Sequence, residues 1–135
     1  MSDIIGIREV EEKVLAIRGL DVILDRDVAE LYGVETKDVN RAVKNNPDKF
    51  PEGYIIPLDS AEWEILRLKF LTLRSSGWGQ HTKYLPQAFT EKGLYMLATI
   101  LKSPRATHTT IAIVETFTKT LKHTIKRDKR EKPTI

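Results

Sequence analysis

We predict an α+β fold for this chain of 135 residues, and three observations in the sequence support the prediction. Two short apolar runs flank Gly19, as in a β-hairpin. Two short segments with helical spacing of apolar residues flank Gly33, and longer helical patterns fill the second half of the chain. The predicted order is an N-terminal β-hairpin, a helix-turn-helix-like pair, a short strand, and further helices that end in a long C-terminal helix.

The first half of the chain predicts a hairpin followed by two short helices. The segment KVLAIRGLDVIL predicts the hairpin over about residues 13–24. The stretch LDRDVAELYG predicts a helix with Asp25 as its N-cap and Gly33 at its end. Thr36 is expected to cap a second helix that reaches about Asn46.

The second half predicts one strand and three helices. The segment FPEGYIIPL predicts a turn and a short strand, and Asp59 and Glu62 have the spacing of a capping box. The helix that they open has an apolar face of Trp63, Leu66, Phe70 and Leu73. Thr90 is expected to cap the helix EKGLYMLATILK, whose inward residues are Leu94, Leu97, Ala98 and Leu101.

The last helix is expected to begin with Ser103 as N-cap and Pro104 as its first residue. Apolar residues recur along it at steps of three and four, at Ile111, Val114, Phe117, Leu121 and Ile125. This stripe predicts that the helix packs against the rest of the protein or against a second copy of itself.

The composition indicates one soluble globular domain over residues 1–127 and a basic, flexible tail over residues 128–135. The chain is 41% hydrophobic and 30% charged, and it contains no cysteine for disulfides or thiolate metal sites. No apolar run approaches the ~20 residues that span a bilayer, and the N-terminus lacks the pattern of a signal peptide. We therefore expect a cytoplasmic protein.

Charge is distributed unevenly along the chain, although the net charge is only +3. Residues 1–36 contain four bases and nine acids, whereas residues 119–135 contain seven bases and two acids. A basic end suits contact with a polyanion through one face, although charged runs more often form an ordinary solvated surface.

Residues 28–46, VAELYGVETKDVNRAVKNN, have the spacing of a bacterial helix-turn-helix. Such a motif needs a small residue where its helices cross, a turn residue that tolerates positive φ, and apolar residues that pin the second helix on the first. Ala29, Gly33 and Val39 meet these three needs. Further apolar pins are expected at Val28, Tyr32, Val34 and Val43.

The outer side of the second helix is the predicted DNA-binding surface, formed by Thr36, Lys37, Asn40, Arg41, Lys44 and Asn45. Asparagine pairs with adenine and arginine with guanine in the major groove, so we expect Asn40 and Arg41 to contact bases. Lys37 and Lys44 are the expected phosphate contacts, and the positive N-terminal end of the helix is also expected to approach a phosphate. In the alternative interpretation, the asparagines only end the helix and the charged side chains are solvated.

Two blocks of the sequence resemble the ORF6N domain. They are IRGLDVILDRDVAELYGVETKDVNRAVKNNPDKFPEGYIIPL and YLPQAFTEKGLYML, and the similarity runs from about Val14 to Phe117. The ORF6N domain is a phage-associated DNA-binding domain related to the KilA-N and Bro-N groups. The resemblance implies an α+β domain that binds DNA and occurs in phage regulators, antirepressors or their bacterial relatives.

The loop SSGWGQHTK departs from this family, whose members commonly have a basic GGRR-like loop at this place. Here the loop keeps only Lys83 and His81 as cations. If the helix-turn-helix is covered by the hairpin or by a second subunit, this loop is the alternative DNA-binding site. Its candidate contacts are Arg74, Ser76, Gln80, His81 and Lys83.

No grouping of a nucleophile, a base and an orienting residue is visible, so we do not expect an enzyme. His81, His108 and His123 lack metal-ligand spacing, and helix capping explains Asp25 and Asp27 better than nuclease chemistry does. We therefore predict no catalytic residue, no metal and no cofactor.

The C-terminal helix offers the main alternative function. Its apolar stripe predicts a homodimer through Val114, Phe117 and Leu121, which would double the footprint on double-stranded DNA. The same helix suits a protein-interaction module instead, an antirepressor that binds a repressor or another phage or host regulatory protein. A steep loss of affinity with salt would distinguish a DNA-binding protein from such a module.

Overall fold

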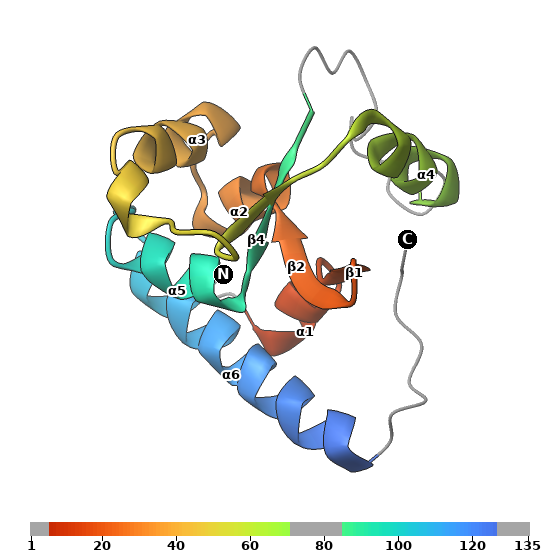
Figure 1. Ribbon diagram of the computed structural model, residues 1–135. Helices are drawn as coiled ribbons and strands as arrows, with labels where there is room; N and C mark the ends of the chain where they lie inside the picture. Colours follow the sequence, from red (N-terminus) through yellow and green to blue (C-terminus); the bar gives the residue numbers. More distant parts are fainter. Residues whose placement is uncertain (1–5, 71–84, 127–135) are drawn as a thin grey trace.

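A four-stranded antiparallel sheet in the order β1-β2-β4-β3 forms the centre of the protein (Figure 1). The computed structural model describes residues 6–70 and 85–126, without the side chains of residues 70 and 120–126. The strands are β1 (Leu15–Ile17), β2 (Leu20–Leu24), β3 (Ile55–Pro57) and β4 (Gln87–Thr90). The helices are α1 (Ile7–Glu11), α2 (Asp25–Tyr32), α3 (Thr36–Lys44), α4 (Ser60–Phe70), α5 (Glu91–Ala98) and α6 (Ala106–Lys126), with a 3-10 turn η1 (Pro47–Lys49). The predicted α+β class is confirmed.

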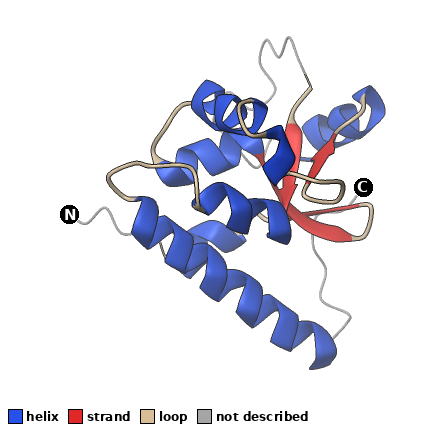
Figure 2. Ribbon diagram, turned by 60° about the vertical axis from the view of Figure 1, so that its left-hand side comes forward, coloured by secondary structure: helices blue, strands red, loops and turns tan. Residues whose placement is uncertain are grey.

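The central strands divide the apolar residues into two clusters because successive side chains of a strand point to opposite faces. The cross-strand pair Ile23 and Phe89 faces the larger cluster, which α1, α2, α3, α5 and α6 complete. The next pair, Leu24 and Ala88, faces the smaller cluster, which α4 completes. Figure 2 shows α4 on one side of the strands and most of the helices on the other.

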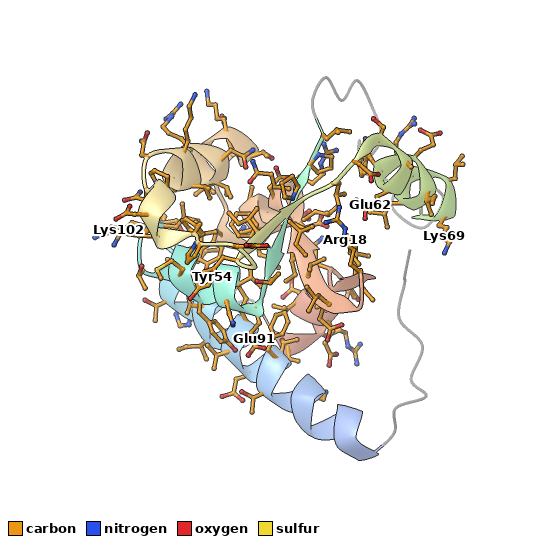
Figure 3. The ribbon with its side chains drawn as sticks, viewed as in Figure 1. Arg18, Tyr54, Glu62, Lys69, Glu91 and Lys102 are labelled. Atoms are coloured by element: carbon orange, nitrogen blue, oxygen red, sulfur yellow. The ribbon has the colours of Figure 1, made fainter. Side chains whose placement is uncertain are left out.

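The predicted hairpin is confirmed, and its turn depends on an unusual arginine. Arg18 has a φ of 54° and Gly19 a φ of 79°, as two-residue hairpin turns with both residues at positive φ require. A residue with a side chain is disfavoured in this conformation by about 1–2 kcal/mol. Arg18 makes two hydrogen bonds of 2.7 Å to the carboxylate of Glu62, from Nε and from Nη2, which connect the turn to the start of α4 (Figure 3).

Glu62 also begins α4, as the predicted capping box requires. The backbone N–H of Asp59 donates to Glu62 Oε1 at 3.0 Å, and the backbone N–H of Glu62 donates to Asp59 Oδ1 at 2.8 Å. Trp63 and Leu66 are buried as expected from the apolar face of this helix. The side chains of Phe70 and Leu73 lie outside the described residues.

Three helices begin at other residues than predicted. The N-cap of α2 is Leu24, so Asp25 is its first helical residue, and the N-cap of α3 is Glu35, so Thr36 is likewise inside the helix. The helix α6 begins at Ala106, after the predicted Ser103 and Pro104. Thr90 does cap α5, because its hydroxyl accepts from the backbone N–H of Gly93 at 3.3 Å.

The strand β4 lies between β2 and β3, although the sequence pattern does not indicate it. It has only four residues, of which Ala88, Phe89 and Thr90 are all buried, so no polar alternation marks it. Its pairing with β2 is therefore a contact over more than 60 residues of sequence that short-range patterns do not report.

The C-terminal end of α2 is held by side chains from α6 and from the segment before it. The last carbonyl groups of a helix have no partner within the helix. Three side chains donate to these carbonyls, Ser103 Oγ to Tyr32 at 2.8 Å, Thr109 Oγ1 to Leu31 at 2.9 Å, and Arg105 Nη2 to Glu30 at 2.9 Å. The segment before α6 and the first turn of α6 thus fix the position at which α2 ends.

We predict that Thr109→Val lowers the free energy of unfolding by about 1–3 kcal/mol, because the buried carbonyl of Leu31 loses its donor while the side chain keeps its shape. Thr118→Val is the control, since Thr118 is exposed on the same helix. Urea unfolding checks the difference. Equal stability of the two variants would contradict this role of Thr109.

We also predict a pH dependence from Glu62. The hydrogen bond from Arg18 lowers the pKa of Glu62 below its ordinary value of 4.5. The folded state therefore binds this proton more weakly than the unfolded state, so the contribution of Glu62 is fully present above about pH 4.5 and is lost as pH falls through the lower folded pKa. The difference in unfolding free energy between wild type and Glu62→Gln should shrink between about pH 6 and about pH 3.

The control for this measurement is Glu64→Gln, because among the described residues the partner of exposed Glu64 is its helical neighbour Arg67, three residues away, at 2.8 Å. Exposed pairs of this kind contribute little to stability. If the difference for Glu62→Gln stays constant over this pH range, or if Glu64→Gln behaves in the same way, the account of Glu62 is wrong.

Candidate nucleic-acid interface

The helices α2 and α3 form the predicted helix-turn-helix. Ala29 is 2% exposed at their crossing, and Val39 of α3 is completely buried against α2. Gly33 ends α2 with a φ of 74°, and a Cβ at this position would lie 2.7 Å from Arg105 Nε. The backbone conformation therefore favours glycine at this position, and the absence of a side chain lets the flexible Arg105 guanidinium pack on it.

The further predicted pins also pack inward. Val28 and Tyr32 are buried, and Val34 and Val43 are partly buried against the same apolar cluster. The hydroxyl groups of Tyr32 and Thr110 are 2.8 Å apart, which connects the first helix of the pair to α6. These contacts hold one side of α3 against the protein and leave its opposite side in solvent.

Three cations lie along that exposed side of α3. Lys37, Arg41 and Lys44 follow each other at steps of four and three, so they form one stripe on a helix. The side chains of Lys37 and Arg41 are 69% and 63% exposed. Figure 1 shows α3 at the edge of the protein, away from α4 and from the C-terminal part of α6. We call this stripe the outer face of α3.

Two carboxylates near the start of α3 moderate its positive charge. Glu35 lies 3.4 Å from Lys37 Nζ, and Asp38 lies 3.8 Å from Arg41 Nη1. The Asp38 carboxylate also accepts from the backbone N–H of Glu35 at 3.1 Å. A negative side chain thus occupies the helix end where a phosphate is expected near Thr36, and any phosphate there has to displace it.

Asn40 does not belong to the outer face. It is half-buried, and its Nδ2 donates to Asp25 Oδ2 of α2 at 3.1 Å. The expectation that it projects outward beside Arg41 is therefore corrected, because its position on the helix places it between the inward Val39 and the exposed residues. Asn45 is exposed at the C-cap of α3, whereas Asn46 Nδ2 donates to the carbonyl of Ala42 at 2.8 Å and closes the helix.

Asp25 is the partner of Asn40 and is 1% exposed. Its carboxylate also accepts from the backbone N–H groups of Arg26, at 2.7 Å, and of Gln87, at 3.4 Å. Burial raises the pKa of Asp25, and the hydrogen bonds from Asn40, Gln87 and Arg26 lower it in part. The sequence predicted a role in helix capping for Asp25. The one signal in the sequence for its burial is that it directly follows the apolar strand LDVIL.

The other predicted DNA-binding residues lie outside the described part of the chain. They are Arg74, Ser76, Gln80, His81 and Lys83.

The predicted dimerisation residues do not share one surface. Phe117 is 4% exposed and packs in the larger core cluster, so it is unavailable to a second copy. Val114 is 39% exposed and Ile111 is 53% exposed, on the side of α6 away from the core. The side chain of Leu121 lies outside the described residues. The apolar stripe is therefore divided between the core and solvent, and Ala112 and Ile113 complete the inward side instead.

Within residues 6–70 and 85–126, the side chains form no group of three or more His, Asp or Glu suited to hold a metal ion. None of the helices described there combines the length and the apolar character needed to cross a bilayer.

Comparison with protein families assigns most of the chain to one domain family. The family model of the ORF6N domain matches residues 12–100, from the turn after α1 to the turn after α5. Comparison with curated proteins and with solved structures gave no match. The matched range contains the whole sheet and the helix-turn-helix, and it covers more than half of the chain. The chain therefore belongs to the ORF6N domain family.

Proposed function

We propose that this chain is a cytoplasmic, non-enzymatic protein that binds double-stranded DNA, with the outer face of α3 in the major groove. In this role it acts as a phage-type transcriptional regulator or antirepressor. The observation that carries the proposal is the stripe of Lys37, Arg41 and Lys44 on the exposed side of the second helix of a helix-turn-helix. The phage-associated character of the ORF6N family is compatible with it.

The three cations have different roles in this proposal. Arg41 presents a planar guanidinium that matches the two acceptors of guanine, so it is the candidate base contact. Lys37 and Lys44 flank it on the same stripe and suit phosphates on either side of the groove. The exposed ion pairs of Lys37 and Arg41 are weak, so exchange of their carboxylate partners for DNA costs little.

Asp38 limits how the helix can approach DNA. Its carboxylate stands beside Arg41 and at the beginning of α3, where it would repel a phosphate. The proposal therefore places the middle and the C-terminal half of α3 nearest the bases, with exposed Asn45 at the end of the contact.

Protein interaction is the second candidate function, and one observation favours it. Ile111 and Val114 expose apolar surface on α6 in the described part of the chain, and such surface suits either a second copy or a regulatory protein. A homodimer would place two copies of α3 on successive half-sites. This surface lies on a different helix from the proposed DNA contact, so the two functions are compatible.

We predict that the chain binds a fluorescently labelled random-sequence duplex and that this affinity falls by orders of magnitude between about 50 mM and 200 mM salt. Arg41→Ala with Lys44→Ala should weaken binding at the lower salt. The double variant should also reduce the steepness of the plot of log affinity against log salt by about 2. The reason is that two cations no longer release counterions from DNA phosphates. Fluorescence anisotropy measures both quantities.

Arg8→Ala with Lys92→Ala is the matched control, because it removes the same charge from exposed positions on α1 and α5. This control should retain the wild-type slope. Absence of binding at the lower salt would refute the proposed function, and equal losses in the two double variants would show that only the overall charge matters. Protein interaction through α6 would then be the function to test.

A further inference from the structure

Asn40 and Asp25 connect the second helix of the helix-turn-helix to the interior of the protein by a directional bond. Asn40 Nδ2 donates to Asp25 Oδ2 at 3.1 Å, and the Asp25 carboxylate is 1% exposed. The same oxygen accepts from the backbone N–H of Gln87, at the start of β4, at 3.4 Å. The carboxylate therefore links α3 to both α2 and the sheet.

The other contacts that hold α3 are mainly apolar. Val39 is buried, and Ala42 and Val43 are partly buried against the larger cluster. Apolar burial is non-directional, so these residues tolerate a small rotation of α3 about its own axis. A hydrogen bond weakens steeply when its angle changes, so the bond between Asn40 and Asp25 opposes such a rotation.

Rotation of α3 matters for DNA binding because neighbouring residues are about 100° apart around a helix. When Asn40 points toward Asp25, Arg41 and Lys44 point outward. A change in rotation would move Arg41 away from the direction in which it meets a base edge. The long lysines would still reach phosphates from many directions.

We propose that Asp25 and Asn40 form a positioning pair that sets the rotation of α3, so that Asn40 acts on DNA recognition through Asp25 and does not touch a base. This inference rests on the proposed function and assigns Asn40 a different role from the base contact that the sequence suggests. For a base contact, the Asn40 amide would have to leave Asp25 and deprive a buried carboxylate of a donor.

The test uses a cycle of variants in the full chain. Asn40→Asp places two carboxylates against each other, and the addition of Asp25→Asn restores one donor and one acceptor with their places exchanged. The wild-type chain first selects a preferred duplex from a random pool. For each protein we then measure the affinity for this duplex and for an unselected duplex, and the ratio of the two affinities is the specificity that is compared. Urea unfolding of each variant separates loss of structure from loss of recognition.

We predict that Asn40→Asp lowers this ratio about tenfold, the size expected for loss of a hydrogen bond to a charged group. The double variant should recover to within about threefold of wild type in this ratio, because a hydrogen bond between positions 40 and 25 is restored. The backbone N–H of Gln87 loses its acceptor in this variant, and that loss should lower the free energy of unfolding without changing the ratio. Asp25→Asn alone should also stay within about threefold. The amide oxygen that this change leaves at position 25 can occupy the place of Oδ2, so that it still accepts from Asn40 Nδ2 and from the backbone N–H of Gln87.

A base contact gives the opposite result in the double variant. An aspartate at position 40 cannot pair with adenine as asparagine does, so the ratio would stay low although stability is restored. That outcome overturns the positioning role, as does an unchanged ratio in Asn40→Asp.

If the double variant does not fold, the Asn40→Ala variant provides the test. Each base pair of the selected duplex is changed in turn, and the affinity of wild type and of Asn40→Ala is measured for every changed duplex. Loss of discrimination spread over several base pairs supports positioning, whereas loss confined to one base pair overturns it. A wild-type chain that selects no duplex refutes the proposed function itself. A wild-type chain that selects a duplex through Arg41, with no effect of the Asn40 variants, refutes only this inference.

Discussion

The end of α2 at Gly33 is the constraint on which the rest of the arrangement depends. The chain must reverse there within a few residues, and the last carbonyls of the helix, beyond those that the backbone N–H groups of Gly33 and Val34 reach, need donors from elsewhere. Ser103, Arg105 and Thr109 supply them. These residues follow the range matched by the ORF6N model, so α6 and the segment directly before it support the helix-turn-helix from outside that range.

Two kinds of interaction hold α3 in place. Apolar burial of Val39 and its neighbours attaches the helix to the core, and the buried carboxylate of Asp25 gives the attachment a direction. On the opposite side, solvated cations with weak partners remain available for other contacts. In the proposed function, rigidity on the inner side makes the outer face of α3 specific, because a fixed scaffold loses little conformational entropy on binding.

Local signals in the sequence were sufficient for much of this fold. The hairpin around Gly19, the close crossing at Ala29, the turn at Gly33 and the capping box of Asp59 and Glu62 all depend on residues close together in the chain. Their physical requirements, positive φ, small size or a reciprocal bond, are visible in the residue types themselves. The inward stripe of α3 followed from periodicity for the same reason.

The remaining features depend on contacts between distant segments. β4 becomes a strand through pairing with β2 and β3, and Phe117 is buried because α1 and α5 pack on α6. The orientation of Asn40 could not be predicted from the sequence for a different reason. A polar residue at the border between the buried and exposed sides of a helix turns inward only if a hydrogen-bond partner lies on the buried side. Asp25 is that partner, but the sequence indicated only a helix cap at this position.

The measurement that tests the central claim most directly is a titration of the ¹⁵N-labelled chain with a DNA duplex at about 50 mM salt, followed by NMR. We predict that the largest changes in amide chemical shift occur along α3, at Lys37, Arg41 and Lys44, while the amides of α1 and α5 stay nearly unchanged. Changes centred on α4 or on α6, with α3 unaffected, would contradict the account.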